Sequence, residues 1–152
     1  MRILSLLFAV LLMSSCKKEK SNCTDYIVFG TYYGECGGEQ CIELYKLTSI
    51  ELFEDSKDNY PATGIYNGTF SIKRSVPDFA LVSNFESTIP TSLLNDTSAV
   101  IGCPDCADGG GVYLEYHKNG IHKVWHIDRT LTLPSDYATF INQTCQKIQA
   151  LK

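Results

Sequence analysis

Two pairs of closely spaced cysteines are the first residues in this chain that could carry chemistry. Cys36 and Cys41 enclose Gly-Gly-Glu-Gln, and Cys103 and Cys106 enclose Pro-Asp. Two such pairs, brought together, could surround a zinc ion with four thiolates. In an exported protein the same sulfurs would form disulfides instead. We predict disulfides, with a zinc site as the alternative.

The Cys103–Cys106 pair also has the Cys-x-x-Cys spacing of thiol oxidoreductases. In those enzymes the reactive cysteine lies at a helix N-terminus, which lowers the pKa of its thiol. Here the glycines at 109–111 follow the pair, and they would break a helix rather than begin one. With Cys23 and Cys145, six cysteines follow Cys16, an even number that fits a disulfide framework without selecting its pairing.

A second candidate site consists of three histidines and a glutamate on one predicted hairpin. His117 and His122 are expected to lie opposite each other, with Cβ atoms about 5 Å apart. Glu115 and His126 lie on the same face of this hairpin because side chains alternate along a strand. Two imidazoles and a carboxylate could bind zinc or copper. The simpler interpretation is a polar face in contact with solvent.

The hairpin that would position these histidines is built around Asn119-Gly120. This dipeptide favours a type I′ turn, in which both central residues have positive φ. The register predicted from this turn pairs Lys118/Ile121, His117/His122, Tyr116/Lys123, Glu115/Val124, Leu114/Trp125, Tyr113/His126 and Val112/Ile127. We expect the core face to carry Val112, Leu114, Tyr116, Ile121, Trp125 and Ile127, with Lys118 and Lys123 near its tip. We expect the solvent face to carry Tyr113, Glu115, His117, His122 and His126, with Val124 among them.

Other segments complete a sheet. Residues 26–33 and 42–47 predict a second hairpin with Cys36 and Cys41 near its tip, because both are rich in β-branched and aromatic residues. Further strands are predicted at 49–54 and 69–73. The turn-rich residues 54–64 between them predict a loop, and one short helix is predicted near 78–86.

The chain ends in a predicted amphipathic helix that begins near Pro134. Its apolar stripe consists of Tyr137, Phe140, Ile141, Cys145, Ile148 and Leu151. Together these elements predict an α+β fold, an antiparallel sheet of hairpins with the C-terminal helix packed on one face. We expect a single domain over residues 23–152.

The first residues predict export. Arg2 precedes an apolar run from Ile3 to Met13, which is shorter than the roughly 20 residues of a membrane-spanning helix and fits the core of a signal peptide. The small residues Ser14 and Ser15 stand directly before Cys16. This arrangement resembles the lipobox of bacterial lipoproteins, and the charged residues after Cys16 resemble the start of lipoproteins from Bacteroidota.

The resemblance implies how the mature protein is attached to a membrane. Residues 1–15 would be removed as a signal peptide. Cys16 would carry a diacylglyceryl group and further fatty acid such as palmitate, and residues 16–22 would form a short tether. Several acyl chains give stable membrane attachment. The implied location is the cell envelope, at the outer membrane, on its periplasmic side or at the cell surface.

Composition narrows the function further. The chain has a net charge of −4, and the predicted signal peptide contains one arginine and no acidic residue, so the mature domain is acidic and we expect no nucleic-acid partner. We find no Ser-His-Asp signature and no paired carboxylates, so we do not assign an enzymatic activity or a cofactor. A non-enzymatic binding module for a protein, peptide or glycan is favoured. The alternatives are a metal-binding lipoprotein that uses either the cysteine pairs or the histidine face, and an envelope hydrolase or redox enzyme.

Overall fold

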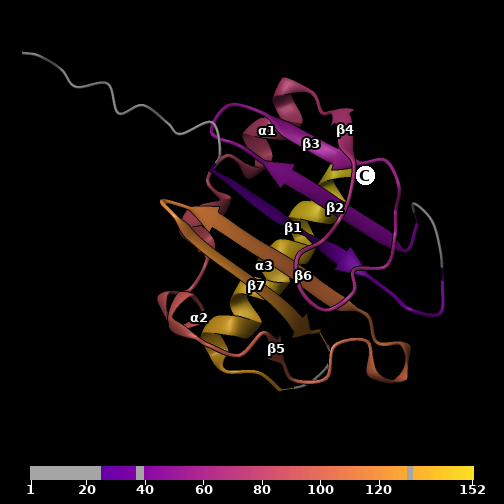
Figure 1. Ribbon diagram of the computed structural model, residues 1–152, viewed down its shortest axis with the longest axis vertical. Helices are drawn as coiled ribbons and strands as arrows, with labels where there is room; N and C mark the ends of the chain where they lie inside the picture. Colours follow the sequence, from indigo (N-terminus) through magenta and orange to yellow (C-terminus); the bar gives the residue numbers. More distant parts are fainter. Residues whose placement is uncertain (1–24, 37–39, 130–131) are drawn as a thin grey trace, which may run out of the picture.

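A computed structural model describes residues 25–36, 40–129 and 132–152. Its central element is a seven-stranded sheet with the order β4-β3-β2-β1-β6-β7-β5 (Figure 1). Neighbouring strands are antiparallel, except that β5 runs parallel to β7. The strands are β1 (Tyr26–Tyr32), β2 (Ile42–Leu47), β3 (Leu52–Asp55), β4 (Phe70–Lys73), β5 (Val100–Ile101), β6 (Gly111–Lys118) and β7 (Ile121–Asp128).

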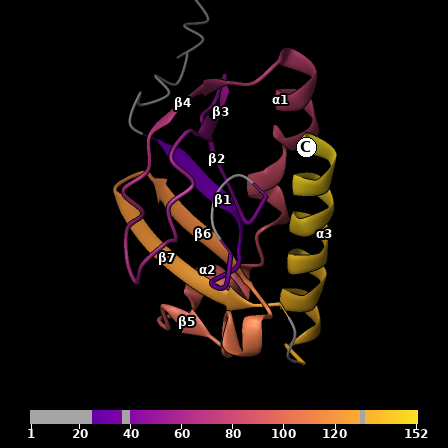
Figure 2. The same cartoon turned by 90° about the vertical axis from the view of Figure 1, so that its right-hand side faces the viewer.

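Helices cover one face of this sheet, and a long loop covers the other. These helices are α1 (Val76–Val82), α2 (Thr91–Asn95), α3 (Ser135–Leu151) and the 3-10 helix Phe85–Thr88. A second 3-10 helix, Cys106–Asp108, lies in the loop before β6. Figure 2 shows α3 along one side of the sheet, and the loop between β3 and β4 on the opposite side. This arrangement confirms the predicted α+β class. None of the helices in the described part of the chain combines the length and the hydropathy needed to cross a bilayer.

The main core lies between the sheet and α3. The predicted apolar stripe of α3 is confirmed, since its large side chains are buried and Cys145 lies partly buried against them. From the sheet, alternate residues such as Phe29, Leu114 and Trp125 face the helix and are at most 1% exposed. Burial of apolar area at about 25 cal/mol per Å² makes this layer the main source of stability.

The predicted β6–β7 hairpin is confirmed in every pair. Lys118 pairs with Ile121, His117 with His122, and the remaining predicted pairs follow as far as Val112 with Ile127. Asn119 and Gly120 have φ values of 52° and 77°, as the type I′ turn requires. The second predicted hairpin is also confirmed, with β1 and β2 paired antiparallel.

The expectation that the polar face of this hairpin contacts solvent is wrong for three of its side chains, whereas His122 is exposed and His117 is half-buried. Tyr113, Glu115 and His126 are only 0%, 2% and 5% exposed. The reason is the loop of residues 56–69, the covering loop, which crosses this face of the sheet between β3 and β4 (Figure 1). Turn residues predicted that this segment is a loop, but they carry no information about the surface on which it packs.

Several short elements differ from prediction. The strand predicted at 49–54 is β3, which begins at Leu52, and the helix predicted at 78–86 is divided into α1 and a 3-10 helix. A capping box, in which Ser75 and Asp78 each bond to the other's backbone N–H, explains why α1 begins at Val76. Neither α2 nor β5 was predicted, because segments of five and two residues are too short to show a hydrophobic period.

Charged side chains fasten the end of α3 to the sheet. Arg74, directly after β4, bonds to Glu54 on β3 at 2.7 Å and donates to the carbonyl oxygen of Leu151. Lys152 forms an ion pair with Glu43 on β2 at 3.0 Å. A cation at the C-terminal end of a helix is favourable because the last carbonyl groups there carry partial negative charge.

Candidate functional site

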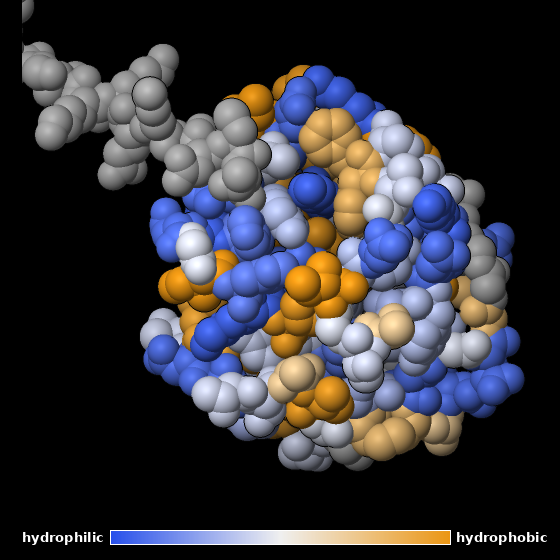
Figure 3. All heavy atoms as spheres, in the orientation of Figure 1, coloured by the Kyte–Doolittle hydropathy of each residue, from blue (hydrophilic) through white to orange (hydrophobic). Residues whose placement is uncertain are grey.

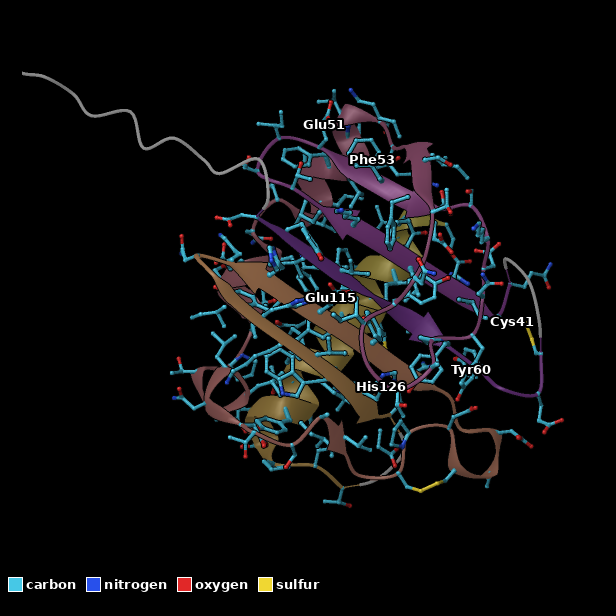
Figure 4. The ribbon with its side chains drawn as sticks, viewed as in Figure 1. Cys41, Glu51, Phe53, Tyr60, Glu115 and His126 are labelled. Atoms are coloured by element: carbon cyan, nitrogen blue, oxygen red, sulfur yellow. A yellow bond between two sulfur atoms is a disulfide. The ribbon has the colours of Figure 1, made fainter. Side chains whose placement is uncertain are left out.

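The candidate site is a group of polar side chains enclosed between the sheet and the covering loop. We define this polar network as Tyr26, Tyr32, Asp55, Tyr66, Tyr113, Glu115, His122 and His126. Its members are buried, except that Tyr26 is half-buried and His122 is exposed at the rim. Strands β1, β3, β6 and β7 supply all of them except Tyr66, which belongs to the covering loop. Figure 4 shows Glu115 and His126 beside this loop, with Tyr60 near His126.

Glu115 is the centre of the network. Its Oε1 accepts a hydrogen bond from the Tyr26 hydroxyl at 2.7 Å and lies 2.9 Å from His122 Nε2. Its Oε2 accepts a hydrogen bond from the Tyr113 hydroxyl at 2.9 Å. Burial and the bond to Glu115 raise the pKa of Tyr26 to about 12, and burial followed by the nearby carboxylate raises the pKa of Tyr113 well above its usual range. Both phenols therefore remain protonated donors at neutral pH.

The same tyrosine connects the sheet to the covering loop. The Tyr113 oxygen accepts a hydrogen bond from the backbone N–H of Tyr66 at 2.8 Å. The Tyr66 hydroxyl donates to Asp55 Oδ2 at 2.6 Å. Asp55, at the end of β3, also accepts from the backbone N–H groups of Asp58, at 2.9 Å, and Thr69. One buried carboxylate thus binds residues near both ends of the loop.

His126 occupies the other end of the network. Its Nδ1 lies 3.1 Å from the Tyr32 hydroxyl, and the ring of Tyr32 passes over Gly111, where a Cβ atom would lie only 2.4 Å from it. Its Nε2 is buried and forms no hydrogen bond within the described residues. Burial lowers the pKa of His126, although the carbonyl groups of Ala62 and Gly64 partly oppose the shift. The neutral imidazole is therefore the favoured form.

The structure brings together part of the predicted histidine cluster. The His117 and His122 rings lie edge to face, with centroids 4.8 Å apart, and His117 also stacks on Tyr26. His122 contacts Glu115, whereas His126 lies beside Tyr32. Among the residues that the structure describes, no group of three or more His, Cys, Asp or Glu side chains is arranged to hold a metal ion.

Four of the cysteines form two local disulfides, which confirms the prediction that this chain contains disulfide bonds. Cys36 is bonded to Cys41, and Cys103 is bonded to Cys106. The four cysteines that the alternative prediction assigned to zinc are therefore used in two separate disulfide bonds. Cys145 lies on α3 as a free thiol, while Cys16 and Cys23 lie outside the described residues.

The loop closed by Cys103 and Cys106 is attached to the candidate site. Between these cysteines, Asp105 accepts hydrogen bonds from the Tyr60 hydroxyl and from the backbone N–H of Gly110, both at 3.1 Å. The Cys103 N–H donates to buried Asp128 at 2.9 Å. Because Tyr60 belongs to the covering loop, the hydrogen bond to Asp105 attaches the covering loop to this disulfide loop.

The tyrosines are the functional residues that sequence reasoning missed. Tyr26 and Tyr32 on β1 lie on the same face as Tyr113 on β6, as their spacing along each strand requires. This alternation could have indicated a second buried face. Asp55, Tyr60 and Asp105 gave no comparable signal, because their partners lie far away in the sequence.

The carboxylates of this network form their hydrogen bonds within the protein. Glu115 faces three hydrogen-bonding groups, and Asp55 accepts hydrogen bonds from both the side chain and the backbone. Such pairing is what burial of carboxylates requires. Comparisons of this chain with models of protein families, with curated proteins and with solved structures gave no match. The geometry itself is therefore the basis for interpreting the site.

Replacement of Glu115 tests the structural role of the network. We expect Glu115→Ala to lower the free energy of unfolding by about 2–3 kcal/mol, because buried donors lose their acceptor. Tyr26→Phe, which removes one hydrogen bond, should cost only about 1 kcal/mol. Urea denaturation measures both values. Equal stability of Glu115→Ala and the wild type would contradict this account.

Burial of neutral His126 predicts a dependence of stability on pH. The unfolded imidazole has a pKa of about 6.5, whereas the folded one has a lower pKa. The unfolded state therefore binds more protons below about pH 6.5, and the free energy of unfolding should fall as the pH is lowered from about 7 to 5. Urea denaturation at a series of pH values measures this dependence. In His126→Gln the part of the pH dependence that is due to this histidine should disappear. Identical slopes for the variant and the wild type would exclude the assignment.

Proposed function

We propose that this protein is a non-enzymatic binding module held at the bacterial cell envelope by a lipid anchor on Cys16. The observation that carries the binding role is the presence of large apolar side chains on the surface, of which Val76 is 80% exposed. The buried carboxylates of Glu115 and Asp55 are paired within the fold, so we assign the role to the surface. The lipobox-like sequence before Cys16 supports the anchor. We place the protein at the outer membrane, where the tether of residues 16–22 would present the domain to partners.

The surface offers apolar side chains for contact with a partner. Ile50, Ile65, Val76 and Ile121 are each more than half exposed. On the face that carries the covering loop, apolar side chains are separated by polar ones rather than gathered in one continuous patch (Figure 3). A protein or peptide partner fits such a mixed surface, and a glycan is the other class that we consider.

A metal-binding lipoprotein is the second candidate function. It is favoured by the contact of His122 with Glu115 at 2.9 Å and by the neighbouring ring of His117. Zinc would be the metal suited to imidazole and carboxylate ligands. A purified protein that retains zinc in a one-to-one ratio would favour this function over the first.

Metabolic labelling tests the anchor. When the full chain is produced in a bacterium that processes lipoproteins, we expect it to incorporate an alkyne-bearing palmitate analogue. Cys16→Ala should lose the label, because it removes the sulfur that accepts the diacylglyceryl group. Cys23→Ala is the matched control and should keep it. Equal labelling of Cys16→Ala and the wild type would disprove an anchor at this residue.

Photo-cross-linking in intact cells tests the binding role. A photoreactive amino acid is placed, one position at a time, at Ile50, Ile65, Val76, Thr97 and Ile121. We expect adducts of defined mass at neighbouring positions and none at the others, since a specific partner covers one part of the surface. The complete absence of adducts would argue against a binding module.

A further inference from the structure

The outer edge of β7 is only partly covered by another strand. β5 pairs with β7 at two positions, Val100 with His126 and Ile101 with Ile127. Along the preceding half of β7, residues 121–125, no strand in the described part of the chain pairs on this side. An uncovered strand edge offers backbone N–H and C=O groups to another chain.

The hairpin register shows which backbone groups point outward. Lys118 and Ile121 flank the two-residue turn and therefore form a hydrogen-bonded pair, so Ile121, Lys123 and Trp125 bond to β6. The even-numbered residues direct their N–H and C=O groups away from β6. The bond from the His126 N–H to the Ala99 carbonyl, 2.9 Å long, agrees with this alternation.

His122 and Val124 therefore present two outward N–H groups and two outward C=O groups. Within the described residues these groups have no backbone partner across the sheet. The opposite edge of the sheet is different. On β4, the Ser71 N–H already bonds to the Thr69 carbonyl at 2.9 Å, which reduces what that edge can offer.

A groove runs beside this edge. It has a volume of about 300 Å³ and is lined by Asp96, Thr97, Ser98, Ala99, Lys123, Val124 and Trp125. Residues 96–99 form its far wall. This wall is braced by α3, because the Tyr137 hydroxyl donates to Asp96 at 3.0 Å.

The side chain of Lys123 does not shield the edge. Edge strands are often protected by a lysine that extends into solvent. Here the Lys123 ammonium group donates to the carbonyl oxygens of Leu94, at 2.5 Å, and Asp96, at 3.4 Å, and is thereby held against the wall. The groove is thus bounded by a fixed wall on one side and, on the other, by a strand whose outward backbone groups have no strand partner among the described residues.

We propose that this groove binds an extended peptide segment of a partner protein, which pairs with β7 at His122 and Val124 as an added strand. The inference rests on the proposed binding function and names its surface and its class of ligand. An extended backbone is the ligand whose donors and acceptors repeat at the spacing of these two residues, about 7 Å along a strand. The backbone pairing would give affinity, and alternate side chains of the peptide would give specificity.

The test starts from the full chain in detergent and a library of random linear peptides. Hydrogen exchange of the backbone amides is then measured with each selected peptide. We expect the His122 and Val124 amides to be protected at least about tenfold. The Lys123 and Trp125 amides, already bonded to β6, should change little and serve as the internal control.

Two further changes separate strand pairing from other binding. N-methylation of alternate peptide residues on the paired edge should abolish binding, whereas methylation of the other edge should preserve it. Val124→Pro removes one outward N–H, which an edge strand tolerates, and should weaken binding by at least about tenfold. Ile65→Ser, on the covering loop, should bind like the wild type. If Val124→Pro fails to fold, the methylated peptides still decide the question.

The possible failures are distinguishable. Peptides that bind but protect other amides, or photo-adducts at Ile65 or Val76 without one at Thr97, would overturn the inference and leave the binding function intact. Failure to select any peptide would also overturn it. Self-association of the chain that protects His122 and Val124 would make a second copy the occupant and would refute a separate partner. Only the absence of adducts at every position tested would remove the proposed function as well.

Discussion

The buried carboxylate of Glu115 is the constraint on which this architecture depends. A carboxylate that is almost completely removed from water must be compensated by donors, or its burial would cost several kcal/mol. Tyr26, Tyr113 and His122 meet this need from β1, β6 and β7. The hydroxyl of Tyr113 donates a hydrogen bond to Glu115 and accepts one from the backbone N–H of Tyr66. The side chain that compensates the buried charge therefore also holds the covering loop in place. The loop in turn keeps water away from the network, so each part depends on the other.

The sheet therefore separates two layers of different chemistry. Beneath α3 the contacts are mainly apolar, and the buried carboxylate of Glu54 at the edge of this layer is paired with Arg74. Beneath the covering loop the contacts are hydrogen bonds among tyrosines, carboxylates and a histidine. The Cys103–Cys106 loop is joined to this second layer through Asp105 and Tyr60. The carboxylates of Glu115 and Asp55 are thus paired within this second layer, and half of the outer edge of β7 is not paired with any strand in the described part of the chain.

Local patterns account for the parts of the fold that were predicted correctly. The Asn119-Gly120 turn determines the β6–β7 register because its backbone geometry admits one alignment, and the stripe of α3 follows from helical period. The candidate site was predicted only in part. The juxtaposition of His117, His122 and Glu115 follows from the register, whereas the burial of Glu115 and His126 does not. Nor could cysteine spacing alone choose between zinc and disulfides, since both use closely spaced pairs.

By itself the sequence determined the two hairpins, the closing helix and the resemblance to a lipoprotein at Cys16, because each depends on residues close together in the chain. Only the tertiary structure decided what covers the second face of the sheet, that the neighbouring cysteines bond within each pair, and that β5 leaves half of β7 unpaired. The physical reason is the same in each case. These outcomes depend on contacts between segments distant in sequence, such as Tyr66 with Tyr113 and Ala99 with His126, whose favourable energies appear only when the chain is compact.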